Sequence, residues 1–194
     1  MGQKTAAIAV FREQGFPQIQ AADFFVVPTA TYRLLFVLVI LAHERRRIVH
    51  VAVTEHPTAA WTTQQVREAF PWDDAAKYLI HDRDHAFAAI AAAMDFQERL
   101  TAPRSPWQNG HVERLIGSIR RECLDHVVIL NEAGLRRVLI GYIEYDSRSR
   151  THLSLNKDAP ISRAVEPPTL GDVAATPEVG GLHVHGESLI SLGF

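Results

Sequence analysis

Apolar and polar positions near the N-terminus of this chain follow a pattern that predicts three strands. A short β-rich run covers 22–27, and a continuous apolar run covers 32–41, as expected for a strand that is buried on both faces. A charged turn at 43–47 leads to a third run, 48–54, which is rich in β-branched residues. Three strands joined by tight turns form a meander.

Further along the chain, short apolar runs alternate with helical patterns. The expected elements are a helix at 58–70, a strand at 78–80, a helix at 85–94, a strand at 97–101, and helices at 111–126 and 131–145. This order predicts an α/β (α+β) fold, with a five-stranded mixed sheet and helices on both faces. The expected core spans 21–165. No ordered element is predicted for the extension at 1–20, and a small β unit is expected in the tail at 166–194.

Length and composition fit one globular domain. The 194 residues are 47% hydrophobic, and the longest apolar run, Leu34–Ala42, is far shorter than the roughly 20 residues that cross a bilayer. The first residues contain no apolar stretch like that of a signal peptide, so a cytoplasmic protein without a membrane partner is expected. Cys123 is the only cysteine, which excludes disulfides within the chain and a Cys-rich zinc site.

Three carboxylates stand where a mixed sheet collects functional groups. Asp23 interrupts the first apolar strand, Asp82 directly follows the strand at 78–80, and Glu113 opens a helix after a Pro- and Gly-containing loop. If the first and fourth strands are neighbours, these side chains can converge. Three converging carboxylates need divalent cations, and oxygen ligands suit Mg²⁺ or Mn²⁺. Two such ions roughly 3.5–4 Å apart can clamp a phosphodiester during in-line displacement.

Each of these acids except Asp23 also has a purely structural interpretation. Asp82 can cap the helix expected at 85–94, and Glu113 can complement a helix N-terminus. Asp84 competes with Asp82, either as the cap or as a group that supports the metal ligands. Asp23 is harder to explain, because an acid inside an apolar run is costly to bury without a partner or a cation.

Basic and aromatic residues near Glu113 are candidates for contact with nucleic acid. The formal charge of the chain is −2, but 99–150 holds nine Arg against six acids. Arg120 and Arg121 share the helix face of Glu113 and can reach phosphates, or simply form a solvated basic face. Trp107 and Gln108 can contact an unpaired base, or the tryptophan can anchor the loop.

Four motifs of the chain resemble those of one known family. They are Asp23-Phe24-Phe25, His81-Asp82-Arg83-Asp84, the run Ser105-Pro-Trp-Gln-Asn-Gly-His-Val-Glu-Arg114, and the downstream run from Tyr145-Asp146 through Arg148, Arg150 and His152. Together they resemble the catalytic core of the DDE superfamily, the retroviral-integrase-like transposases of bacterial insertion sequences, over roughly residues 20 to 165. The family fold is ribonuclease-H-like.

This resemblance implies a function and a set of residues. Asp23, Asp82 and Glu113 would bind two Mg²⁺ or Mn²⁺ ions for DNA hydrolysis and strand transfer, with Asp84 in support. The partners would be the element ends and target DNA, at the bacterial nucleoid, and the active form would be a homo-oligomer. The residues expected to contact DNA are Arg104, Trp107, Gln108, Asn109, Arg114, Arg120 and Arg121.

The chain departs from the family pattern in two ways. Only 30 residues separate Asp82 from Glu113, about one helical turn fewer than usual in the family. Only 22 residues precede Asp23, which leaves no room there for a helix-turn-helix. We therefore also consider a catalytically inactive remnant that binds DNA or protein, and a ribonuclease-H-type nuclease acting on RNA–DNA hybrids.

Overall fold

The computed structural model describes residues 8–9, 19–42, 44–70, 78–81, 97–100, 110–164, 167, 169 and 171–188. The strands are β1 Ile8–Ala9, β2 Ile19–Pro28, β3 Leu34–Ala42, β4 Ile48–Thr54, β5 Tyr78–His81, β6 Gln97–Leu100, β7 Val173–Glu178 and β8 His183–Ser188. The α-helices are α1 Ala59–Ala69, α3 Gly110–Glu122 and α4 Glu132–Arg148. Short 3₁₀ turns are η1 Glu44–Arg46, η3 Leu124–His126, η4 Leu153–Leu155 and η6 Val179–Gly181. The helix expected at 85–94 lies outside the described residues.

The main sheet is mixed, as the sequence predicts. Its strand order is β1-β4-β3-β2-β5-β6. The meander β2-β3-β4 is antiparallel, whereas β5 runs parallel to both β2 and β6. The described sheet has six strands rather than five, because Ile8–Ala9 pairs with β4 in the segment for which no ordered element was predicted. Two residues are too few to produce a strand pattern in the sequence.

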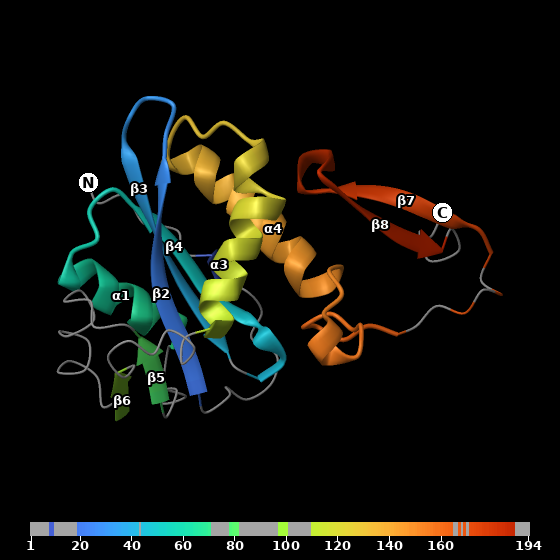
Figure 1. The fold of residues 1–194 in the computed structure, drawn as a ribbon, viewed down its shortest axis with the longest axis horizontal. Coiled ribbons are helices and arrows are strands. Elements are labelled where there is room, and N and C mark those ends of the chain that lie inside the picture. Colours follow the sequence, from blue (N-terminus) through green and yellow to red (C-terminus); the bar gives the residue numbers. More distant parts are fainter. Residues whose placement is uncertain are drawn as a thin grey trace.

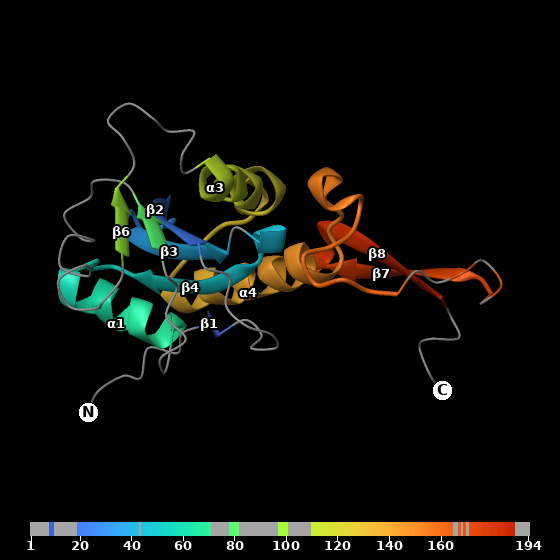
Figure 2. The same ribbon diagram turned by 90° about the horizontal axis from the view of Figure 1, so that it is seen from below.

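Helices cover the two faces of this sheet. In β2, Ala21, Phe25 and Val27 belong to a core shared with α3 and α4, whereas Ala22 and Phe24 pack on the α1 side. This alternation follows from the two-residue period of a strand. Figure 2 shows α1 and α3 on opposite sides of the sheet. Asp23 lies two residues from both Ala21 and Phe25, so it belongs to the same α3 face of β2.

Local signals explain where the two best-capped helices begin. Thr58 accepts a hydrogen bond from the Trp61 amide at the start of α1, and Asn131 accepts one from the Gly134 amide at the start of α4. Along α3, the predicted apolar stripe is buried against the sheet: Val112, Leu115, Ile116, Ile119 and Cys123. No helix in the described part of the chain is long and apolar enough to span a membrane.

The C-terminal part forms a two-stranded antiparallel hairpin, β7–β8. It lies beyond the end of α4, away from the main sheet (Figure 1). The Ser149 hydroxyl donates to Glu178 Oε1 at 2.7 Å, and the His183 ring stacks on Tyr145 with 4.2 Å between centroids. The sequence pattern of this tail predicts strands at 170–175 and 181–186, and the observed strands begin three and two residues later.

Candidate active site and the adjoining polar network

Asp23 lies in the middle of β2, on the sheet face that α3 covers. Its backbone pairs with Val39 of β3, and its Oδ1 accepts a hydrogen bond from the Phe24 amide at 2.8 Å. The side chain is half-buried, between the fully buried Ala21 and Ala22 and the buried Phe25. A carboxylate in this position is held by the most regular part of the sheet, so its position is well defined.

The strand that precedes Asp82 lies directly beside β2. The parallel register pairs Ala21 with Ile80, and β5 ends at His81. The neighbouring first and fourth predicted strands are therefore present. Asp82 itself lies outside the described residues, as do Asp84, Arg104, Trp107, Gln108 and Asn109. Their roles stay predictions.

Glu113 stands in the first turn of α3 and is exposed. The helix crosses β2 in the same direction as the strand, because the turn after β2 bonds to the segment after α3 through Ala30 N and Ile129 O at 2.8 Å. Further along α3, Arg120 Nη2 donates to the Val26 carbonyl at 3.1 Å. This bond, together with the apolar packing of α3 on Ala21, Phe25 and Val27, sets how α3 lies along β2.

The rises of a helix and a strand then relate Glu113 to Asp23. Seven helical residues span about 10.5 Å, which is close to the length of three strand residues, roughly 10 Å. Arg120 is level with Val26, so we expect Glu113 to be level with Asp23. Among the described residues no group of three or more His, Cys, Asp or Glu is arranged to hold a metal. The two described members of the candidate triad are both carboxylates, which is the donor type that Mg²⁺ and Mn²⁺ prefer.

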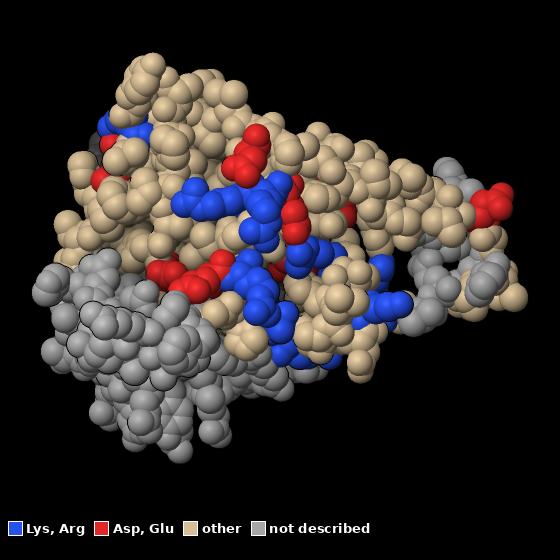
Figure 3. Space-filling view, viewed as in Figure 1, with Lys and Arg blue, Asp and Glu red and all other residues tan. Residues whose placement is uncertain are grey.

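The arginines of α3 differ in their surroundings. Arg120 lies over the Phe25 ring, 5.4 Å from its centroid, in addition to its bond to Val26. The Arg121 side chain folds back over Gly117. A Cβ at position 117 would lie 2.9 Å from Arg121 Nη1, so a residue larger than glycine there would displace this side chain. Arg114 is exposed. Basic side chains gather over the middle of this face of the molecule (Figure 3).

Part of the sequence matches a known protein family, and the fold matches solved structures. Residues 94–160, about a third of the chain, match the family model of the integrase core domain. A chain of the simian T-cell lymphotropic virus intasome, solved with the PP2A regulatory subunit B56 gamma, superposes with a TM-score of 0.59 at 12% identity, covering 92% of this chain and 69% of that one. No curated protein matches the chain.

Two further structures are catalytic domains. The HTLV-2 integrase catalytic core domain in complex with magnesium has a TM-score of 0.54 at 14% identity and covers 76% of this chain and 97% of that one. The catalytic domain of the Mos1 mariner transposase has a TM-score of 0.52 at 12% identity, covering 66% and 70%. The chain has the fold of an integrase and transposase catalytic core. The resemblance predicted from its motifs is confirmed.

The integrase-type core contains a polar network that sequence reasoning missed. Arg150 holds the Glu122 carboxylate with two hydrogen bonds, Nε to Oε2 at 2.9 Å and Nη2 to Oε1 at 2.7 Å. The Tyr142 hydroxyl donates to Glu122 Oε2 at 2.9 Å, and the His183 ring nitrogen Nε2 lies 2.9 Å from the Glu122 carbonyl oxygen. The network joins α3, α4 and the hairpin. Its only signal in the sequence is that Arg150 belongs to a family-like motif.

Burial and charge shift the ionisation of this network in opposite directions. Burial raises the pKa of Glu122, but the hydrogen bonds from Arg150 and Tyr142 outweigh it, so the pKa is lowered overall. Burial, with the nearby charges of Asp146 and Glu122, raises the pKa of Tyr142. Asp146 is 1% exposed, and burial raises its pKa to about 6, although Arg150 opposes the shift. Burial therefore disfavours the ionised form of Asp146.

Replacing Asp146 by Asn is expected to stabilise the core at pH 8 by about 3 kcal/mol, because the pKa of Asp146 rises from 3.8 to about 6 and one pKa unit corresponds to about 1.4 kcal/mol. The pKa of Asp146 is raised in the folded state, so its carboxyl group contributes its full stability to the fold only below about pH 4. This stability is lost as the pH rises through about 6. Urea unfolding at pH 4.5 and pH 8 measures the change. Asp125→Asn, at an exposed position, is the control and should differ by less than about 0.5 kcal/mol. Equal stability of Asp146→Asn and its parent at pH 8 would contradict the expectation.

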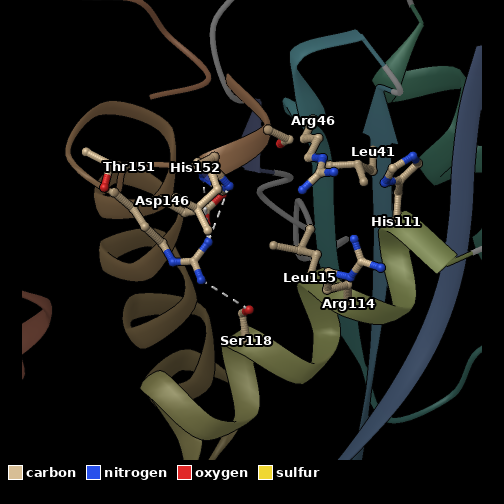
Figure 4. Close-up of a pocket in the computed structure, with 12 residues that line it drawn as sticks. Leu41, Arg46, His111, Arg114, Leu115, Ser118, Asp146, Thr151 and His152 are labelled. Atoms are coloured by element: carbon tan, nitrogen blue, oxygen red, sulfur yellow. Dashed lines mark hydrogen bonds and ion pairs between the residues drawn. The ribbon is translucent and has the colours of Figure 1, made fainter. Parts of the chain in front are cut away.

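Beside this network lies an open pocket of about 510 Å³. Its lining comes from α3, the end of β3 with η1, and the last turn of α4 with the segment that follows it. Figure 4 shows Arg46, His111 and Arg114 on one side, with Asp146 and His152 across from them. Burial lowers the pKa of His111, and the charges of Arg46 and Arg114 lower it further.

Proposed function

We propose that this chain is a DDE-type transposase or integrase core, which hydrolyses and transfers DNA strands with two Mg²⁺ or Mn²⁺ ions. The observation that carries the proposal is the arrangement of β2, β5 and α3. Asp23 shares the sheet face of Ala21 and Phe25, and Ile80 of the strand that precedes Asp82 pairs with Ala21 of β2. The helical rise from Arg120, which contacts Val26, leads us to expect Glu113 level with Asp23. These are the three positions that the family motifs mark.

The chain's own residues have distinct tasks in this reaction. Asp23, Asp82 and Glu113 would hold the ions, which supply Lewis-acid charge stabilisation and activate the attacking oxygen. The sheet fixes Asp23, and the packing of α3 on Phe25 and Val26 fixes the helix that carries Glu113. Water would attack a phosphodiester, releasing a 3′-hydroxyl on the element end and a 5′-phosphate on the flanking strand. That 3′-hydroxyl would then attack a target phosphodiester, so that the element end is joined to the target 5′-phosphate and a target 3′-hydroxyl is released. Arg104, Trp107, Gln108, Asn109, Arg114, Arg120 and Arg121 would contact DNA, and Asp84 would support the ligands.

Transposition requires that two DNA ends are held together, so the active form is expected to be a homo-oligomer. HTLV-2 integrase cores, which share the fold, are described in dimeric and trimeric forms. One observation favours a second candidate, a DNA-binding remnant without catalysis. The 30 residues between Asp82 and Glu113 are fewer than in the family, and a misplacement of about 1 Å can cost roughly a hundredfold in rate.

Incubation of the protein with supercoiled plasmid and with end-labelled duplex tests the proposal. Nicked and joined products are expected with Mg²⁺ or Mn²⁺, and their rate should fall to background in EDTA, because the three carboxylates cannot activate the phosphodiester without cations. The RNA–DNA hybrid of the same sequence serves as the comparison substrate. DNA binding without metal-dependent products would establish the remnant instead, and hybrid cleavage without joining would establish a ribonuclease-H-type nuclease.

A further inference from the structure

Two arginine side chains of the pocket beside α3 have no ion-pair partner among the residues that the structure describes. Arg46 and Arg114 line it from η1 and from the first half of α3. In the described part of the chain, neither guanidinium is within salt-bridge distance of a carboxylate, although the other arginines that line or border the pocket, Arg45 and Arg150, each have one. Figure 4 shows Arg46 and Arg114 turned toward the same space.

The backbone that carries Arg46 is strained and clamped. Arg45 and Arg46 have φ values of 50° and 55°, in the left-handed region, which costs a non-glycine residue about 1 kcal/mol or more each. The Arg45 side chain fixes the turn by donating to Asp158 Oδ2 at 2.7 Å, to the Ala159 carbonyl at 2.8 Å and to the Pro160 carbonyl at 2.9 Å. The strain persists because these bonds hold η1 against the segment that follows α4. Arg46 is thereby preorganised at the pocket.

The other lining groups complete an anion site. Asp146 is the one acid among the described residues of the lining and is 1% exposed, with Arg150 Nη1 3.5 Å from its Oδ1. The hydroxyl-bearing residues Ser118, Thr151 and Ser154 also line the pocket. Guanidinium groups with hydroxyl donors nearby are the usual ligands of a phosphate group.

We propose that this pocket binds one phosphate group of a DNA backbone between Arg46 and Arg114. The DNA source rests on the proposed function, since Arg114 directly follows Glu113 and a strand held here passes beside the candidate metal site. Arg46 is a contact that no motif of the sequence indicates. It lies in the turn after β3, far from α3 in the chain.

The salt dependence of DNA binding tests this site without any catalysis. Affinity for a labelled duplex is measured by fluorescence anisotropy in EDTA from 50 to 200 mM salt. The plot of log K against log salt has a slope of about −0.9 per phosphate contact. For the double variant Arg46→Gln/Arg114→Gln, the slope should be less steep by about 0.9, the value of one phosphate contact. Raising the salt from 50 to 200 mM should then weaken DNA binding by a factor that is roughly 3.5-fold smaller than for the parent.

A charge-matched control separates the site from general attraction. Arg67→Gln/Arg137→Gln removes two exposed arginines of α1 and α4 and should leave the slope unchanged. Equal slopes for the two double variants would overturn the site, and a loss near twice the expected value would overturn a single shared phosphate.

Inorganic phosphate at matched ionic strength distinguishes the two sources of a phosphate group. The expected result is that phosphate competes with the duplex for the parent protein and not for the Arg46→Gln/Arg114→Gln variant. If phosphate raises the melting temperature of the parent alone while the duplex slopes are equal, the pocket binds free phosphate and the DNA assignment is wrong. A failure to observe metal-dependent cleavage would contradict the proposed triad but not this phosphate site, because the DNA-binding assay contains no metal.

Discussion

Replacing Glu113 by Gln is expected to reduce metal-dependent strand cleavage on the order of a thousandfold. A metal ion contributes several kcal/mol of charge stabilisation to a phosphoryl transition state, and about 1.4 kcal/mol corresponds to a factor of ten. Gln keeps the size of the side chain but removes the charge that holds the cation. Asp23→Asn and Asp82→Asn should have effects of the same order. Initial nicking rates of supercoiled plasmid in Mg²⁺ measure the change.

The matched control for Glu113 is Glu132, which stands in the first turn of α4 as Glu113 does in α3. If Glu113 only complements a helix N-terminus, its loss costs about 0.3–1 kcal/mol of stability and no more activity than Glu132→Gln. We expect Glu113→Gln to unfold within about 1 kcal/mol of the parent and to bind DNA in EDTA as the parent does. Nicking rates of Glu113→Gln equal to those of Glu132→Gln would remove Glu113 from the site.

The part of the fold with strong periodicity could be predicted from the sequence. The runs at 32–41 and 48–54 became β3 and β4, since nearly every residue of those strands is buried. The apolar stripe of α3 was predicted for the same reason: Leu115 and Ile119 recur at helical spacing and face the core. Patterns of this kind report burial, and burial is what the hydrophobic effect selects.

Features that depend on long-range pairing could not be predicted in this way. Asp23 was identified as a candidate ligand from its position in an apolar run. Whether Glu113 lies near it depends on how α3 packs along β2, and the hydrogen bond from Arg120 to Val26 is one contact that sets this packing. Glu122 and Arg150 are 28 positions apart, and each alone resembles a solvated charge. The basic excess at 99–150 therefore has mixed causes, because some of these arginines stabilise the fold and others are available to phosphates.

Replacing Arg150 by Met is expected to destabilise the core by about 3 kcal/mol. Breaking a buried ion pair costs about 3–5 kcal/mol, because the remaining charge loses its partner, and the lower end applies since the Arg150 and Glu122 side chains are 24% and 27% exposed. The substitution also leaves Asp146 without its nearest cation. Urea unfolding at pH 7.5 measures the loss, which is expected as a lower midpoint at an unchanged slope.

Arg148 provides the control for Arg150, because it ends the same helix and pairs with Glu144 at 2.7 Å, but with side chains that are 45% and 53% exposed. Arg148→Met should cost less than about 1 kcal/mol, as expected for a surface pair. Adding Glu122→Gln to Arg150→Met removes the charge left without a partner, so the double variant should recover part of the lost stability. If Arg150→Met is no less stable than Arg148→Met, the network does not hold α3 to α4. Destabilisation with recovery in the double variant would instead show that one ion pair between distant positions holds the helix of Glu113 to the end of α4.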